Sequence, residues 1–126
     1  MSIAKFILIL PLVYCSLLQS EEMPLTQTHR VFQFENEHVR VWKTVIMPHQ
    51  PLKMHRHDCP RVVVGLKGGT LTKIEEAGET SDLNFESGVA YWLTEDPPGT
   101  FHGDINQSDE SIEVMVIELK ALDTRN

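Results

Sequence analysis

The chain has 126 residues, 41% of them hydrophobic and 23% charged, a length that fits one domain. This composition excludes a disordered chain, a collagen and a disulfide-dense miniprotein. Eleven basic residues stand against 18 acidic ones, so the net charge is −7 and nucleic acid is not an expected partner. Six histidines are many for so short a chain.

Residues 1–20 have the layout of a secretory signal peptide, with Lys5 ahead of an apolar run over 6–18. That run is shorter than the roughly 20 residues that a membrane-spanning helix needs. We expect cleavage after Ser20 and export, either to a bacterial periplasm or as a secreted protein. Cys15 leaves a lipoprotein anchor open as an alternative, although such signals carry a small residue where Tyr14 stands.

Cleavage leaves 106 residues and removes one charged side chain, Lys5, so the charge of the mature chain becomes −8. Cys59 is then the single cysteine, and no intramolecular disulfide can form. Stability must therefore come from a hydrophobic core, which a domain of this size can bury. The charge pattern indicates no membrane-binding surface, so no membrane partner is expected after cleavage.

The mature chain consists of short apolar runs between turn-forming residues. Residues 21–37 predict an N-terminal arm or edge strand, and 121–126 form a C-terminal tail. Breaks are predicted at 48–51, at the polar loop 75–82 and at 95–99. Strands are predicted over 31–34, 38–47, 61–66 (buried on both faces), 70–74, 83–86, 88–93 and 112–119. Such regular short strands indicate an all-β sandwich or barrel.

Two segments concentrate the histidines. Side chains alternate along a strand, so His55 and His57 are expected on one face, with Arg56 on the other. The turn over 97–101 is expected to deliver His102 onto another strand. Three neutral imidazoles with open coordination positions form a catalytic type of transition-metal site. His55, His57 and His102 are therefore the predicted metal ligands.

These two segments resemble the two motifs of the cupin superfamily. The first motif has the form G-x5-H-x-H-x3,4-E-x6-G, and the second has the form G-x5-P-x-G-x2-H-x3-N. Their histidines and later fixed positions are matched here by His55, His57, Gly68, Pro97, Gly99, His102 and Asn106. The leading glycine of the second motif departs, because Gly88 lies eight residues before the proline. The resemblance covers residues 38–120 and implies a double-stranded β-helix, or jelly-roll barrel, a structural role for the asparagine, and a homodimer.

The first motif departs from the family at two positions. Its leading glycine falls at His49, and the glutamate that serves as fourth ligand falls at Arg61, whose guanidinium cannot coordinate a metal. Three outcomes stay open. The site is a three-histidine centre, with Arg61 swung to the rim to bind a carboxylate or phosphate. Alternatively the pocket is metal-free, or Asp58 or Cys59 replaces the glutamate.

Two functions follow from the resemblance. In the first, a divalent iron, manganese, zinc or nickel ion acts as Lewis acid or oxygen activator on a small anionic molecule oriented by Arg61. In the second, the protein is a metal-free, non-catalytic binding protein that holds a small organic ligand in the barrel mouth. Tyr91 and Trp92 alternate along their strand, so one of them is expected to line the ligand pocket. Asp58 and Asp104 are acid or base candidates by proximity, while His29, His38 and His49 are assigned to the surface or to turns.

Overall fold

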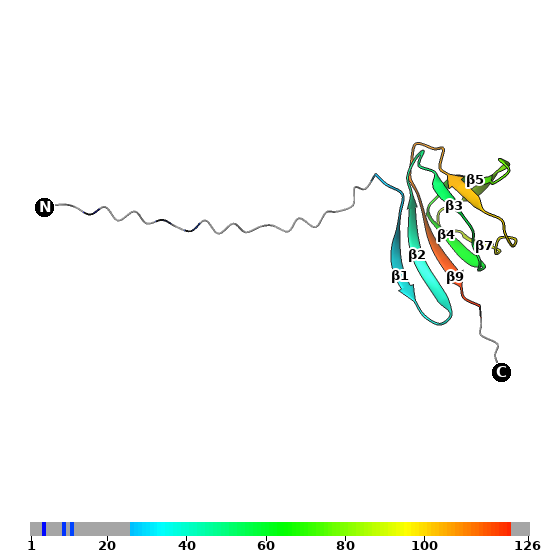
Figure 1. Cartoon of the computed structure of the whole chain (residues 1–126), viewed down its shortest axis with the longest axis horizontal. Coiled ribbons are helices and arrows are strands. Elements are labelled where there is room, and N and C mark those ends of the chain that lie inside the picture. Colours follow the sequence, from blue (N-terminus) through cyan, green and yellow to red (C-terminus); the bar gives the residue numbers. More distant parts are fainter. Residues whose placement is uncertain (1–3, 5–8, 10, 12–25, 122–126) are drawn as a thin grey trace.

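A computed structural model describes Ala4, Ile9, Pro11 and residues 26–121 (Figure 1). The predicted cleavage site, Cys15, most of the predicted signal peptide and the tail 122–126 lie outside the described residues. Within the described part of the chain, no helix is long and apolar enough to span a membrane.

Nine strands make up the described fold, which confirms the all-β class. They are β1 (His29–Glu35), β2 (Val39–Ile46), β3 (Leu52–His55), β4 (Arg61–Lys67), β5 (Gly69–Glu75), β6 (Thr80–Phe85), β7 (Ala90–Leu93), β8 (His102–Ile105) and β9 (Ile112–Leu119). The predicted loop 75–82 is shorter in the structure, because β5 and β6 pair antiparallel from Gly69↔Phe85 to Ile74↔Thr80.

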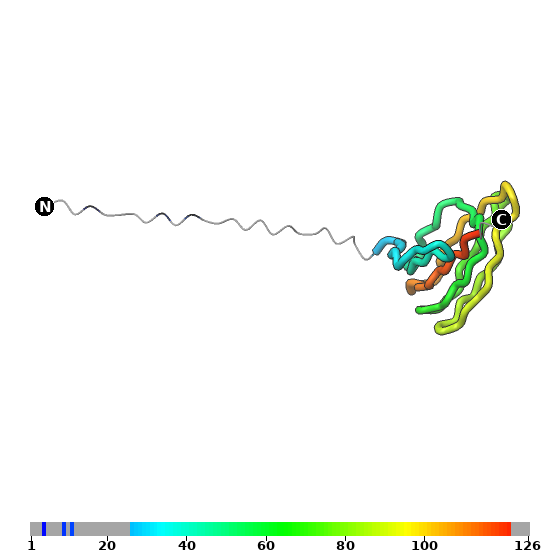
Figure 2. Tube along the Cα trace, turned by 90° about the horizontal axis from the view of Figure 1, so that it is seen from below, coloured from blue at the N-terminus to red at the C-terminus, as the bar shows by residue number. Residues whose placement is uncertain are grey.

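The strands form two antiparallel sheets in which several neighbouring strands are distant in the sequence. One sheet has the order β1-β2-β9-β4-β7 and the other β3-β8-β5-β6. The last strand, β9, lies between β2 and β4, as Figure 2 shows in orange and red between cyan and green. Its pairing with β2 runs without interruption from Val39↔Leu119 to Ile46↔Ile112. The two halves of the chain are therefore interleaved, as a jelly roll requires.

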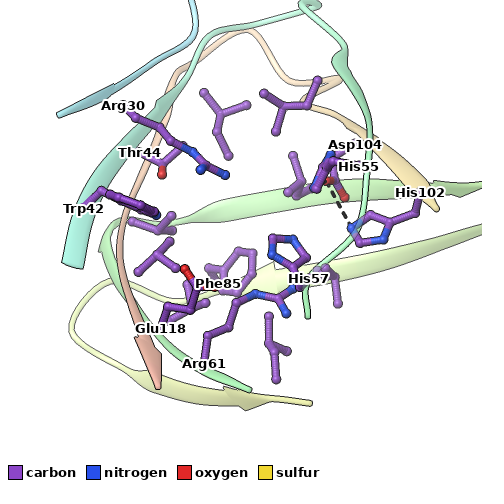
Figure 3. A pocket seen from close by; sticks show the side chains of 18 residues that line it. Arg30, Trp42, Thr44, His55, His57, Arg61, Phe85, His102, Asp104 and Glu118 are labelled. Atoms are coloured by element: carbon purple, nitrogen blue, oxygen red, sulfur yellow. Dashed lines mark ion pairs between the residues drawn. The ribbon is translucent and has the colours of Figure 1, made fainter. Parts of the chain in front are cut away.

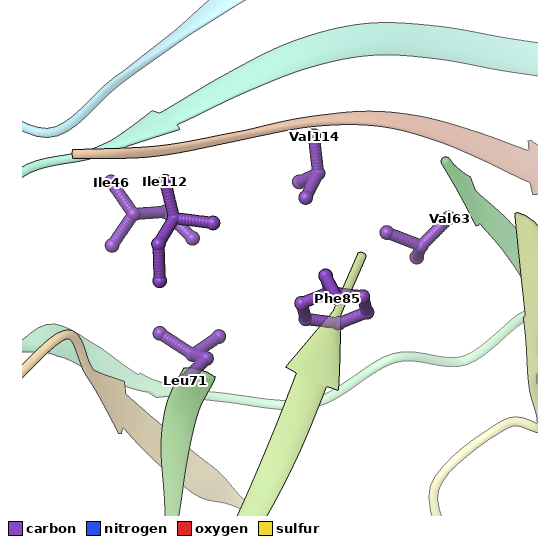
Figure 4. Packing of buried hydrophobic residues seen from close by; sticks show 6 residues of the cluster. All are labelled: Ile46, Val63, Leu71, Phe85, Ile112 and Val114. Atoms are coloured by element: carbon purple, nitrogen blue, oxygen red, sulfur yellow. The ribbon is translucent and has the colours of Figure 1, made fainter. Parts of the chain in front are cut away.

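The core lies between the two sheets and draws side chains from both (Figure 4). Each such side chain contributes roughly 1.5–3 kcal/mol when it leaves water. The buried members are Ile46, Val63, Leu71, Phe85, Ile112 and Val114. Strand β4 is not buried on both faces as predicted: Arg61, Val63 and Gly65 are buried, whereas Val62 and Val64 are only half-buried. One face of this antiparallel sheet is covered by the core, and the other is partly open.

Two residues of the family motifs have structural roles in the fold. Asn106 is 0% exposed, and its amide group donates to the carbonyls of Ile46 (3.2 Å) and Glu110 (2.7 Å). Its Oδ1 accepts from the backbone N–H and the hydroxyl of Ser108, at 3.0 and 2.7 Å. At Gly68, an added Cβ would collide with the backbone carbonyl of Phe85. The asparagine ties β2 to the turn after β8, and the glycine allows close backbone packing after β4.

Candidate metal centre

The three predicted histidines meet inside the barrel (Figure 3). One ligand atom from each of His55, His57 and His102 lies within 4.8 Å of the other two. The strand pairing explains part of this arrangement, because His55 on β3 is the register partner of His102 on β8. The ring centroids are 4.6 Å apart for that pair, and 4.9 and 5.4 Å from His57 to His55 and His102.

Contacts at Nδ1, a hydrogen bond for His55 and a carboxylate contact for His102, leave Nε2 as the available ligand atom of these two rings. His55 Nδ1 lies 2.6 Å from the carbonyl oxygen of Lys53, to which it can only donate, so Nε2 carries the free lone pair. His102 is 3% exposed, and its Nδ1 lies 3.3 Å from Asp96 Oδ2. A carboxylate behind one ring nitrogen is the usual arrangement that orients a metal-binding imidazole.

His57 lies beyond the end of β3, so strand alternation does not set its direction as predicted. Asp96 holds it instead: the His57 backbone N–H donates to Asp96 Oδ2 (2.7 Å), and the Asp96 N–H donates to the His57 carbonyl (2.9 Å). Asp96 precedes Pro97 in the turn that leads to His102. One buried carboxylate therefore supports a histidine from each segment. Sequence reasoning missed Asp96, although its place beside the motif proline was the available signal.

The electrostatics of the site favour the neutral form of two of the histidines, His57 and His102. Burial, followed by the positive charge of Arg61, lowers the pKa of His57 from 6.5 to about 3. Burial also lowers the pKa of His102, against the opposing effect of Asp104 and Asp96. Burial raises the pKa of the Asp104 carboxyl, while the positive charges around it act in the opposite direction. Neutral imidazole is the form that binds a metal.

Arg61 does not swing to the rim as expected. It is 8% exposed, and its guanidinium lies inside the pocket next to His57 (Figure 3). The residue begins β4 on the inward-facing side, so alternation directs it towards the core. Among the described residues, the Arg61 side chain makes one hydrogen bond, from Nη1 to the Thr94 carbonyl at 3.4 Å, and forms no ion pair with a carboxylate within 4 Å. Burial lowers its pKa, but a guanidinium stays charged.

The other candidate ligands near the first motif do not join the cluster. The Asp58 carboxylate pairs with Arg56 Nε at 2.6 Å, and its side chain is largely exposed. Cys59 is half-buried, and its pKa is raised by burial and then by Glu118. Three histidines, and no carboxylate or thiol, make up the described group whose ligand atoms all lie within 4.8 Å of one another. Asp58 and Cys59 are also absent from the lining of the pocket that contains these histidines.

The rest of the pocket combines an apolar interior with two arginines. It is lined by Arg30, Trp42, Thr44, Ile46, Leu52, His55, His57, Arg61, Val63, Leu71, Leu83, Phe85, Leu93, His102, Asp104, Val114, Val116 and Glu118. Figure 3 shows Arg30 reaching in from the side opposite His102. Arg30 lies on β1, before residue 38, where the domain was predicted to begin, so the sequence did not link this arginine to the site.

Neither aromatic residue predicted as a ligand contact lines this pocket. The Tyr91 ring packs on Phe85 at a centroid distance of 5.4 Å, and its hydroxyl accepts the Glu86 N–H at 2.9 Å. Trp92 is 59% exposed, on the opposite face of β7. Leu93 is the residue of β7 that reaches the pocket. The prediction that Tyr91 or Trp92 lines the pocket is therefore wrong.

Comparison with known proteins finds similarity to solved structures of cupins. A cupin domain from Bordetella pertussis Tohama I is 31% identical, with a TM-score of 0.65 over 75% of this chain and 94% of that one. An RmlC-like cupin family protein with a double-stranded β-helix fold from Methanocaldococcus jannaschii is 14% identical, with a TM-score of 0.58 over 78% and 84%. The polyketide cyclase RemF from Streptomyces resistomycificus is 14% identical, with a TM-score of 0.55 over 73% and 64%. The last two are similar in fold alone. No protein-family model matches the chain, and no curated protein matches it.

Proposed function

The chain belongs to the cupin superfamily, and we propose from this membership that it binds one divalent transition metal through His55, His57 and His102. The observation that carries the proposal is the convergence of three imidazoles, with ligand atoms within 4.8 Å of one another. Nitrogen donors of this kind suit zinc, iron, nickel and, less strongly, manganese.

The surroundings of the histidines fit a metal. Two rings have an identifiable support, the Lys53 carbonyl behind His55 and the Asp96 carboxylate behind His102, and Asp96 also holds the backbone of His57. A buried oxygen, Asp104 Oδ1, also faces this region without a hydrogen-bond partner. A bound metal supplies Lewis acidity or oxygen activation. Burial favours the neutral form of His57 and His102, and the apolar wall of the barrel limits water.

We further propose that the pocket takes a small anionic molecule. Arg61 is a buried cation without a carboxylate within 4 Å among the described residues, and such a charge normally has a partner. Arg30 lines the same pocket, so two guanidinium groups flank the space in front of the histidines. A carboxylate or phosphate group is the natural partner, because a guanidinium can bind either with two parallel hydrogen bonds.

Arg61 also favours one alternative function, metal-free binding of an organic anion. A cation next to His57 opposes a metal ion by Coulomb repulsion, which is strong in a partly dry pocket. In that case the histidines act as hydrogen-bonding groups for the ligand. Metal analysis of the purified protein separates the two functions.

Metal content is the direct test of the proposed function. The full chain, purified without chelators and dialysed after exposure to Zn²⁺, should hold about one metal per chain by elemental analysis, as a site with three protein ligands predicts. His55→Ala should lose most of that metal, because it removes one of three ligands. His38→Ala is the matched control, since His38 is exposed and pairs with Glu37 outside the pocket. Metal-free wild-type protein would support the alternative.

The signal-peptide layout of residues 1–20 supports the proposal that the protein is exported. Sequencing the N-terminus of the secreted or periplasmic protein should give a start near Glu21. A cytoplasmic protein that retains Met1 would contradict export, while leaving the metal-site proposal intact.

A further inference from the structure

Asp104 is a buried carboxylate in the centre of the candidate site. It is 5% exposed and lies two residues after His102 on β8, so both side chains point to the same face of that strand. Its register partner on β3 is Leu52, three residues before His55. Asp104 therefore lies beside two of the three histidines, and all three of these residues line the pocket.

One oxygen of Asp104 lies close to the free nitrogens of both histidines. Oδ2 is 3.4 Å from His55 Nε2 and 3.6 Å from His102 Nε2. These distances exceed the 2.7–3.2 Å range of a normal N–H···O hydrogen bond. They match the spacing of about 3.4 Å between two atoms that each lie about 2.1 Å from one ion in tetrahedral geometry.

The other contacts of this carboxylate are also those of a metal ligand. Its second oxygen, Oδ1, is buried and has no hydrogen-bond partner. The lysine opposite in register on β5, Lys73, pairs with Glu75 at 2.7 Å and forms no ion pair with Asp104 among the described residues. A buried carboxylate normally has a cation or several hydrogen-bond donors. Asp104 has the two imidazoles alone within 4 Å among the described ion pairs.

We propose that Asp104 is the fourth protein ligand of the metal and replaces the glutamate that the first motif has lost at Arg61. This inference rests on the proposed function, because it concerns the same ion. The carboxylate comes from the second motif segment rather than the first. It restores one negative charge to the ligand set, and that charge offsets the repulsion between the metal and Arg61.

Cobalt binding to the full chain tests this assignment. Co²⁺ affinity, measured by competition with a chelator, should fall by about 100-fold or more in Asp104→Asn and by less than about tenfold in Glu118→Gln. Both substitutions remove one negative charge from the same pocket, but Glu118 lies beside Arg61 rather than beside the histidines (Figure 3). The visible absorption of bound Co²⁺ should also change in Asp104→Asn, because a ligand is lost. Equal losses of affinity in the two variants would overturn the assignment.

A crystal structure of the Co²⁺-loaded wild type is the second test, and it does not depend on the variants folding. An Asp104 oxygen at bonding distance, about 2.0–2.2 Å from the metal, is the expected result. Metal held by the three histidines with Asp104 out of bonding distance would overturn the inference and leave the proposed function standing. A wild type that binds no Co²⁺ would instead contradict the proposed function itself.

Discussion

The two motif segments supply the same candidate centre but are supported in different ways. His55 ends the four-residue strand β3, and His57 lies beyond it, where Asp96 from the other segment holds its backbone. In the second segment, His102 is 3% exposed and starts β8, and Asn106 behind it is fully buried. The first segment departs from the family at two fixed positions, whereas the second keeps every position from Pro97 onward.

The second segment therefore contributes supporting carboxylates to the candidate site as well as a histidine. Asp96 supports His57 and His102, and Asp104 is the proposed replacement for the missing glutamate. Both carboxylates belong to the stretch 96–104, which approaches the first segment across the β3–β8 pairing. In this stretch Asp96, His102 and Asp104 are buried, whereas His55 and His57 of the first segment are only half-buried.

The largest expected effect is at the anchor of the second segment. Asn106→Ala should lower the free energy of unfolding by about 3 kcal/mol, because it removes four hydrogen bonds and leaves buried carbonyls of Ile46 and Glu110 unpaired. Urea unfolding of the full chain measures the change. Asn84→Ala is the control: Asn84 is exposed, with a single hydrogen bond from Thr70, and its loss should stay within about 0.5 kcal/mol. Similar values for the two variants would show that Asn106 does not anchor the second segment.

An intermediate effect is expected when the glutamate of the first family motif is restored at position 61. Arg61→Glu should raise Zn²⁺ affinity by about tenfold, because a carboxylate replaces a buried cation beside His57. Arg30→Glu makes the same charge change on the opposite side of the pocket and is the control. Titration against a competing chelator gives both affinities. If the two variants bind Zn²⁺ equally well, the change in affinity depends only on the net charge of the pocket and not on the position of Arg61 beside His57.

The smallest effect is expected at His49, the other position where the first motif departs from the family pattern. His49 has φ = 60°, in the left-handed region where a side chain costs energy and glycine does not. His49→Gly relieves this strain but also increases the conformational entropy of the unfolded chain, which opposes the gain. The net expected effect is a rise of about 0.5–1 kcal/mol in the free energy of unfolding. His38→Gly should lower it by a similar amount, because only glycines and His49 have positive φ among the described residues. Destabilisation of both variants would show that the ion pair between His49 and Asp109 matters more than backbone strain.

Most of the fold was predictable, because it depends on local patterns. β-Branched runs and turn residues marked the strands that became β2, β4, β5 and β9, and the histidine spacing pointed to the cupin motifs. β3 was the exception, since its four residues lie between two turns and show little apolar alternation. Strand alternation failed for His57 for the same reason: the strand ends before it, and a distant carboxylate sets its position.

The sequence by itself determined which residues carry the chemistry: three histidines in two spaced motifs, with an arginine where a glutamate is usual. Spacing along a chain is enough for this, because each motif is a strand and a turn of defined length. Only the tertiary structure decided that Arg61 points inward, that Tyr91 and Trp92 lie off the pocket, and that Asp96 and Asp104 face the histidines. Those outcomes depend on the pairing of β3 with β8 and of β4 with β9, and contacts between strands so far apart in the sequence have no local signature.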